Sequence, residues 1–133
     1  MNHFECKLTV RGYELDSFGH VNNSVYLQYA ETAVWNFVKV SGMMEETLGK
    51  GLFPVVLEST QRYIHELKLL ETVRIETTIE CSGGVLLAKH KMYNDTTGKL
   101  SCKVKCKMAF VNRERIICDI PQAVIDYLER DTK

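Results

Sequence analysis

The sequence predicts an α+β fold in which an antiparallel sheet encloses one helix. Three observations support this prediction. Residues 22–41 carry apolar side chains at three- and four-residue spacing, five other segments alternate apolar and polar residues, and turn-forming sequences separate several of those segments. Apolar residues cover more than half the circumference of the helix, so something wider than one neighbouring helix must enclose it. Asn22 or Asn23 is suited to cap its N-terminus, and Gly42 to stop it.

The first predicted strand, over 4–10, alternates apolar and polar residues as a strand with one buried face does. Residues 12–21 then form a predicted loop. This segment is too long for a hairpin turn, and it is rich in glycine, aspartate, serine and histidine. The loop therefore leads directly into the N-terminus of the buried helix.

The second half of the chain is predicted to form four strands and a short helix. The strands are expected over 55–67, 72–81, 85–94 and 100–112. Hairpin turns are predicted at 82–84 and 95–98, and Pro121 suits the first position of a terminal helix over 122–130. We therefore expect a single domain, 1–133, with a long central helix wrapped by a five-stranded antiparallel sheet and a short C-terminal helix.

Composition narrows the class of protein. The chain has 133 residues, of which 45% are hydrophobic and 26% charged, as in an ordinary globular domain. Its 17 basic and 17 acidic residues give a net charge of zero, so we expect no nucleic-acid partner. The first seven residues contain no apolar segment typical of a signal peptide, and no apolar segment is long enough to span a membrane. We expect a cytoplasmic protein with no membrane partner.

Cysteine and histidine usage predicts neither a disulfide framework nor a metal site. The five cysteines are odd in number and scattered, so free thiols are expected, with Cys102 and Cys106 packed on one face of a strand. His3, His65 and His90 have no metal-ligand spacing, and each is expected to be an exposed or partly buried strand residue.

The loop before the helix carries the residues best suited to chemistry. Unpaired N–H groups and the positive end of the helix dipole point into this loop, where they can stabilise an oxyanion. Asp16 lies within reach as a nucleophile or general base, and Gly19 permits close backbone approach to a ligand. Ordinary turn and capping chemistry explains the same residue types, so local physics alone leaves both interpretations open.

A sequence motif favours the catalytic interpretation. Residues 16–31, D-S-F-G-H-V-N-N-S-V-Y-L-Q-Y-A-E, resemble the signature of the 4-hydroxybenzoyl-CoA thioesterase-like family of the hotdog fold. The resemblance extends to the order of elements along nearly the whole chain. It implies an acyl-CoA thioesterase that hydrolyses an acyl-CoA thioester to a free acid and coenzyme A.

The resemblance also implies roles for individual residues. Asp16 matches the catalytic carboxylate, and the backbone N–H of Asn23 matches the group that polarises the thioester carbonyl. His20 matches an orienting or assisting residue of the site. The residues implied to contact substrate are Gly19, Val21, Asn22, Asn23 and Tyr26. The family implies a homodimer or homotetramer, with no metal or other cofactor beyond the coenzyme A of the substrate.

Several alternatives remain open. The motif is also similar to that of plant acyl-carrier-protein thioesterases, although Phe18 replaces their asparagine. A non-catalytic acyl-thioester sensor would use the same pocket without turnover, and a hotdog dehydratase would pair a histidine with an acidic residue. Glu31, in the helix, is expected to contact the loop rather than to catalyse. The alternating lysines form either a solvated face or a surface for coenzyme A phosphates: Lys89, Lys91, Lys103, Lys105 and Lys107.

Overall fold

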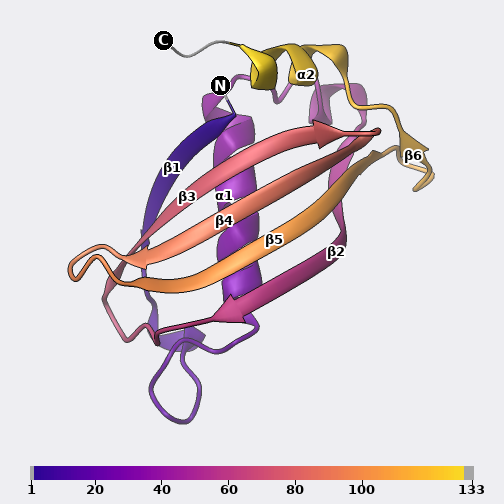
Figure 1. The fold of residues 1–133 in the computed structure, drawn as a ribbon. Coiled ribbons are helices and arrows are strands. Elements are labelled where there is room, and N and C mark those ends of the chain that lie inside the picture. The colour runs from indigo at the N-terminus through magenta and orange to yellow at the C-terminus, as the bar shows by residue number, and fades with distance from the viewer. Residues whose placement is uncertain (1, 131–133) are drawn as a thin grey trace.

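Figure 1 shows a computed structural model of the protein, which describes residues 2–130. The predicted domain boundaries, 1 and 133, lie outside the described residues. The elements are, in order, β1 (His3–Thr9), η1 (Gly12–Glu14), α1 (Val25–Val40), η2 (Leu48–Lys50), β2 (Phe53–Tyr63), β3 (Thr72–Ser82), β4 (Val85–Asn94), β5 (Leu100–Val111), β6 (Ile117–Cys118) and α2 (Gln122–Glu129).

The strands form one antiparallel sheet in the order β1-β3-β4-β5-β2, with β6 paired to the end of β5. The sheet curves across α1, and α2 lies near the C-terminal end of α1 (Figure 1). The sheet therefore has six strands, and the prediction of five was wrong. The additional strand has only two residues, too few to show any alternation in the sequence.

The helix is also shorter than the long central helix predicted over 22–41. It spans 16 residues, Val25–Val40, and Asn22 and Asn23 precede it in a turn. The side chain of Asn22 accepts hydrogen bonds at 3.0 Å from the backbone N–H and the hydroxyl of Ser24, which holds that turn outside the helix. Gly42 has a φ of 75°, so the predicted stop is confirmed.

Alternation along the strands directs one face of the sheet against α1. From the sheet, the buried side chains of this core include Val73, Ile75, Ile79, Leu86, Ala88, Met92, Cys102, Val104, Cys106 and Met108. Those contributed by α1 are Val25, Tyr26, Tyr29, Ala30, Ala33, Val34, Phe37 and Val38. The five cysteines are free, and Cys102 and Cys106 are buried on one face of β5, as predicted.

The segment after β2 leaves the sheet earlier than predicted. The backbone N–H groups of Ile64 and His65 both donate to the carbonyl of Ser101, at 2.9 and 3.1 Å. Further along, the carbonyl of Leu67 accepts a 2.8 Å hydrogen bond from the N–H of Val21. Residues 64–67 therefore cross to the loop before α1 instead of extending β2, and they help to form the site at that end of the helix.

No helix among residues 2–130 combines the length and apolar character needed to cross a membrane.

Candidate active site

A small cavity of about 180 Å³ opens at the N-terminal end of α1. It brings together five of the seven residues that the sequence singled out: Asp16, His20, Val21, Asn23 and Tyr26. The other two, Gly19 and Asn22, are exposed and do not line it. Gly19 has a φ of 82°, so its role in the structure is to form the loop turn that a side chain would strain.

The two oxygens of the Asp16 carboxylate differ in their contacts. Oδ1 accepts hydrogen bonds from the backbone N–H groups of Phe18, at 2.9 Å, and His20, at 3.2 Å. No group among residues 2–130 donates to Oδ2. The half-buried Asp16 therefore shapes its loop with one oxygen and leaves the other available to a ligand.

The backbone around Asn23 presents an unused donor. Neighbouring N–H groups are engaged: that of Asn22 donates to the Glu14 carbonyl at 2.8 Å, and that of Ser24 donates to the Asn22 side chain. Among the described residues, no hydrogen bond engages the N–H of Asn23. Because the helix begins two residues later, this N–H lies where the helix dipole is positive.

His20 is held by a carboxylate partner that the sequence did not indicate. Its Nε2 lies 3.0 Å from Oε2 of Glu66, and both side chains are partly exposed. Glu66 also lines the cavity, together with Tyr63, Ile64 and His65. These four residues follow the loop by more than 40 positions. Tyr63 comes from the last position of β2, and the early end of that strand brings the other three to the loop.

Tyr63 and Tyr26 form an aromatic wall of the cavity. Their ring centroids lie 5.5 Å apart, and the Tyr63 hydroxyl donates a 3.2 Å hydrogen bond to the carbonyl of Asn23. Burial raises the pKa of Tyr26, so its hydroxyl stays neutral at physiological pH. The wall thus fixes the turn that presents the Asn23 N–H without adding charge to the site.

A buried carboxylate anchors the loop to the helix. Glu14 is 4% exposed and accepts hydrogen bonds from the Arg11 guanidinium at 2.7 and 3.0 Å and from the Tyr29 hydroxyl at 2.8 Å. Burial by itself raises the pKa of Glu14, but the hydrogen bonds from Arg11 and Tyr29 outweigh it, and the pKa is lowered. No pattern in the sequence pointed to these three residues, although Arg11 and Glu14 lie beside the motif.

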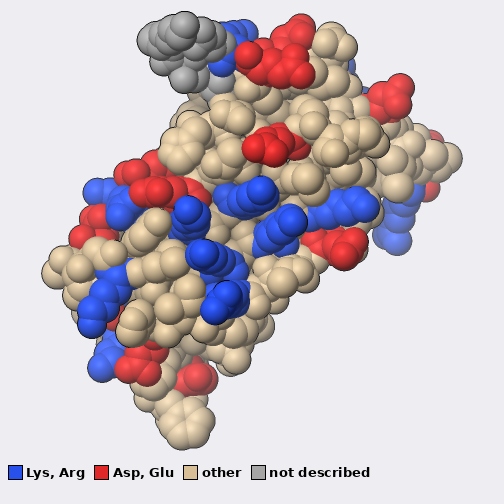
Figure 2. All heavy atoms as spheres, viewed as in Figure 1, with Lys and Arg blue, Asp and Glu red and all other residues tan. Residues whose placement is uncertain are grey.

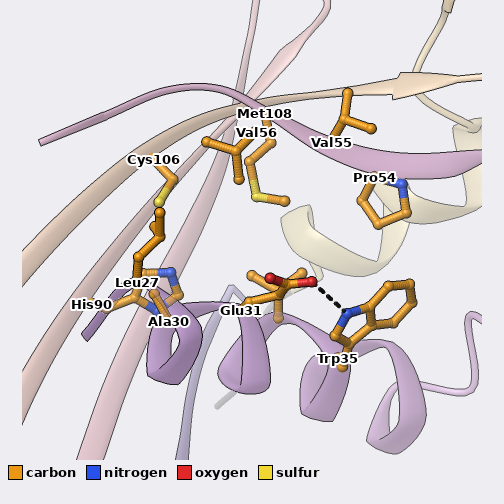
Figure 3. A pocket seen from close by; sticks show the side chains of 11 residues that line it. Leu27, Ala30, Glu31, Trp35, Pro54, Val55, Val56, His90, Cys106 and Met108 are labelled. Carbon is orange, nitrogen blue, oxygen red and sulfur yellow. Dashed lines mark hydrogen bonds between the residues drawn. The ribbon is translucent and has the colours of Figure 1, made fainter. Parts of the chain in front are cut away.

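A larger pocket, of about 350 Å³, lies between α1 and strands β2, β4 and β5. Its lining is mainly apolar and consists of Leu27, Ala30, Glu31, Val34, Trp35, Pro54, Val55, Val56, His90, Cys106 and Met108. Figure 3 shows the Glu31 carboxylate pointing into it from α1. Glu31 accepts a 3.4 Å hydrogen bond from Nε1 of Trp35, so the expected contact with the loop was wrong.

His90 lies at the end of this pocket near Leu27 and Ala30, far from Trp35 (Figure 3). It is 1% exposed, which corrects the expectation of an exposed or partly buried histidine. Its Nδ1 lies 2.8 Å from the Thr77 hydroxyl, and burial lowers its pKa to about 4. The imidazole is therefore neutral at physiological pH.

The outer face of the sheet is basic. Figure 2 shows a group of positive side chains over β4 and β5. These include Lys89 directly opposite Lys105, and Lys91 directly opposite Lys103. Arg62 of β2 pairs in register with Lys103. Within residues 2–130, none of these basic side chains forms an ion pair, so the face presents its positive charge to solvent.

Comparison with known proteins identifies the class and the family. The chain superposes on a 1,4-dihydroxy-2-naphthoyl-CoA thioesterase of Synechocystis with a TM-score of 0.84, 13% identity and 95% of each chain covered. The protein thus has the hotdog fold. The sequence profile of the Thioesterase-like superfamily matches residues 10–128, and the chain belongs to this superfamily.

Two curated relatives match parts of the chain. The chloroplastic acyl-acyl carrier protein thioesterase ATL3 of Arabidopsis thaliana is 35% identical over 65 residues, which cover 48% of this chain and 34% of ATL3. The long-chain acyl-CoA thioesterase FadM of Escherichia coli K12 is 28% identical over 80 residues, covering 60% of this chain and 61% of FadM. The chain therefore spans less than two thirds of the length of either relative.

Proposed function

We propose that the protein is an acyl-CoA thioesterase that hydrolyses an acyl-CoA thioester to a carboxylic acid and coenzyme A. One observation carries the proposal. The cavity at the N-terminal end of α1 is lined by both Asp16, whose Oδ2 is available, and Asn23, whose N–H is unengaged. Acyl transfer needs this pairing of a carboxylate with an oxyanion donor. Membership of the Thioesterase-like superfamily and the similarity to FadM support it.

In the proposed reaction the thioester carbonyl oxygen accepts a hydrogen bond from the Asn23 N–H. Asp16 either removes a proton from water, whose oxygen attacks the carbonyl carbon, or attacks that carbon itself to form an anhydride that water then hydrolyses. In both routes the carbon–sulfur bond breaks. The leaving thiolate of coenzyme A takes the proton held by Asp16 in the first route and a proton from solvent in the second. Neither route needs a metal or redox cofactor.

His20 is proposed to assist by position rather than by proton transfer. Its contact with Glu66 joins the loop to residues 64–67, and its backbone N–H binds Oδ1 of Asp16. A change at His20 is therefore expected to alter the direction of the Asp16 carboxylate. Val21 and Tyr26 are proposed to line the reacting end of the substrate, next to Asn23.

The acyl group is proposed to occupy the larger pocket. Leu27, Ala30 and Val34 are spaced at three and four residues, so they share one face of α1. Asn23 lies in the turn that leads into the N-terminus of the same helix. The cavity and the pocket therefore follow one another along α1. A pocket of about 350 Å³ with a mainly apolar lining suits an acyl group, and its volume lies within the range of small-molecule sites.

The decisive experiment is thiol release from a panel of acyl-CoAs by the wild type and by Asp16→Asn. We expect kcat/KM to fall by roughly 10²–10⁴-fold in the variant, because asparagine cannot accept a proton or form an anhydride. Binding of acyl-CoA without thiol release by the wild type would contradict the proposal and favour a sensor. Hydration of an enoyl-CoA would instead favour a dehydratase.

An acyl carrier protein as the leaving group is a second candidate. Two observations favour it: the similarity to ATL3, and the basic face of the sheet, which suits an acidic partner. Comparing kcat/KM for matched acyl-CoA and acyl-carrier-protein substrates at low and high salt separates the two. A preference for the carrier protein that disappears at high salt would favour this candidate.

A homodimer in the cytoplasm completes the proposal. Strand β2 is an edge strand whose sheet neighbour is β5, and it carries exposed Val56 and Leu57. Because an edge strand leaves backbone donors and acceptors unpaired, a second copy of β2 is a suitable partner. Pro54, Val55 and Val56 also line the larger pocket, so pairing at this edge would narrow its opening.

A further inference from the structure

The His90 imidazole has one ring nitrogen without a partner. Its Nδ1 contacts the Thr77 hydroxyl at 2.8 Å, but its Nε2 is buried and has no hydrogen-bond partner among the described residues. A buried polar atom without a partner costs free energy, and native proteins contain few of them. In a substrate pocket, the missing partner is well explained as a group of the ligand.

The residues around His90 supply no hydrogen-bond partner for Nε2, so a bound ligand is the source that remains. Thr77 is on β3, so Nδ1 is directed to that side of β4, and Nε2 lies on the other side of the ring. The pocket beside the imidazole is lined by the apolar or weakly polar side chains of Leu27, Ala30 and Cys106. Because Nε2 is fully buried, a ligand group reaches it only when neighbouring side chains move aside. No strong donor or acceptor of this lining is positioned to satisfy Nε2.

The position of His90 relates it to the far end of an acyl chain. Val25, the first residue of α1, and Ala30, beside His90, are separated by five residues, or roughly 7.5 Å along the helix axis. Asn23, at the proposed carbonyl site, precedes Val25 by two further residues. An acyl group that extends along α1 from the carbonyl therefore reaches His90 several carbons away. The apolar lining between them requires that part of the chain to be apolar.

We propose that His90 Nε2 binds a hydroxyl group near the far end of the acyl chain, so that the preferred substrates are hydroxylated acyl thioesters. This inference rests on the proposed thioesterase function and specifies its substrate class. A hydroxyl fits because it both donates and accepts, and so it pairs with either neutral tautomer of His90. A wholly apolar chain leaves Nε2 unpaired, and a carboxylate brings charge into a pocket that already contains Glu31.

The first test compares isosteric substrates. The ω-hydroxyhexanoyl-, ω-hydroxyoctanoyl- and ω-hydroxydecanoyl-CoAs are paired with heptanoyl-, nonanoyl- and undecanoyl-CoA, in which a methyl group replaces the hydroxyl. At the length that reaches His90, we expect kcat/KM to favour the hydroxylated substrate by roughly 5–100-fold. Equal kcat/KM values within every pair, or a preference for the methyl group in all of them, would overturn the proposal.

Variants assign the preference to Nε2. His90→Phe is expected to abolish the preference, whereas His90→Gln, which keeps a polar atom near the Nε2 position, is expected to retain part of it. Thr77→Val removes the partner of Nδ1 but leaves Nε2, so it is expected to weaken the preference less than His90→Phe does. A preference that survives in folded His90→Phe would contradict the proposed role.

A binding measurement on the wild type needs neither turnover nor a variant. In ¹⁵N NMR spectra, ω-hydroxyoctanoate is expected to shift the Nε2 signal of His90 more than nonanoate does, with His3, His20 and His65 as references. If the protein releases no thiol from any acyl-CoA but shows this shift, the thioesterase proposal fails and the hydroxyl site stands. If it hydrolyses acyl-CoAs and His90 does not distinguish the two acids, the hydroxyl site fails alone.

Discussion

Asp16 and His20 close the loop before α1 through two hydrogen bonds. The backbone N–H of Asp16 donates to the carbonyl of His20 at 2.8 Å, and the N–H of His20 donates to Oδ1 of Asp16 at 3.2 Å. The same Oδ1 accepts the N–H of Phe18 at 2.9 Å. Oδ1 of Asp16 therefore maintains the loop, whereas Oδ2 is the oxygen proposed to act in catalysis. The contribution of Asp16 to stability can thus be measured separately from its contribution to activity.

This separation predicts different effects of two substitutions at Asp16. Asp16→Asn keeps an oxygen that accepts both loop N–H groups, so its free energy of unfolding is expected to match the wild type. Asp16→Ala leaves the two donors without their partner and is expected to lose about 1–2 kcal/mol. Urea unfolding followed by circular dichroism measures both values. Equal stability of the two variants would show that the loop does not depend on Oδ1.

Glu14 is expected to stabilise the fold in a manner that depends on pH. Because its pKa is lowered from the ordinary 4.5, its contribution is fully present above that value and is lost as the pH falls through the lower pKa of the folded state. Glu14→Gln is expected to cost about 1–3 kcal/mol at pH 7, since it weakens the contacts with Arg11 and Tyr29. The difference between wild type and variant should shrink below pH 4.5.

Tyr29→Phe is the matched control for Glu14, because it removes one hydrogen bond and keeps the Arg11 ion pair. Its cost is expected to be smaller, about 1 kcal/mol. A Glu14→Gln protein as stable as the wild type at pH 7 would show that the anchor contributes nothing.

Much of the fold was predictable from the sequence because alternation and helical spacing act locally. The turns at 82–84 and 95–98, the stop at Gly42 and the terminal helix are all present. The two-residue strand β6 was missed because it depends on a tight reversal in which the Asn112 side chain accepts the N–H groups of Glu114 and Ile116. Such a contact leaves no periodic signal.

The candidate site was only half predictable. The motif located Asp16, Asn23 and Tyr26 because they are close in sequence. Tyr63 reaches the same cavity from the last position of β2, and Glu66 reaches it because the chain turns away from the sheet after β2. No local pattern indicated that turn. His90 was expected to be exposed or partly buried, although alternation places position 90 on the inner face of the sheet.

The lowered pKa of His90 predicts a loss of stability in mild acid. Its folded pKa, about 4, lies below the ordinary 6.5, so its contribution is fully present above pH 6.5 and is lost as the pH falls toward 4. Full loss corresponds to about 3 kcal/mol, since one pKa unit is about 1.4 kcal/mol. Unfolding free energies measured between pH 7 and 4.5 should therefore fall more steeply in the wild type than in His90→Phe.

Glu31→Gln is the control for this pH effect, because it removes the carboxylate that lines the same pocket and leaves the imidazole. We expect the unfolding free energy of Glu31→Gln to fall with decreasing pH as steeply as that of the wild type. Parallel pH profiles of the wild type and His90→Phe would show that His90 takes up its proton without unfolding.

The exposed edge at β2 predicts that self-association depends on Leu57. Leu57 is 46% exposed and falls at an irregularity of the β2–β5 ladder, outside the paired register. In a twofold-symmetric pair the same edge is used twice, so Leu57→Lys brings two positive charges toward each other. We expect the wild type to sediment as a dimer and Leu57→Lys to dissociate with a Kd at least about tenfold higher, equivalent to 1.4 kcal/mol.

Ile117→Lys changes a comparably exposed residue on β6 and is expected to leave the dimer intact. A monomeric wild type, or a dimer disrupted only by Ile117→Lys, would assign the edge of β2 no role in assembly.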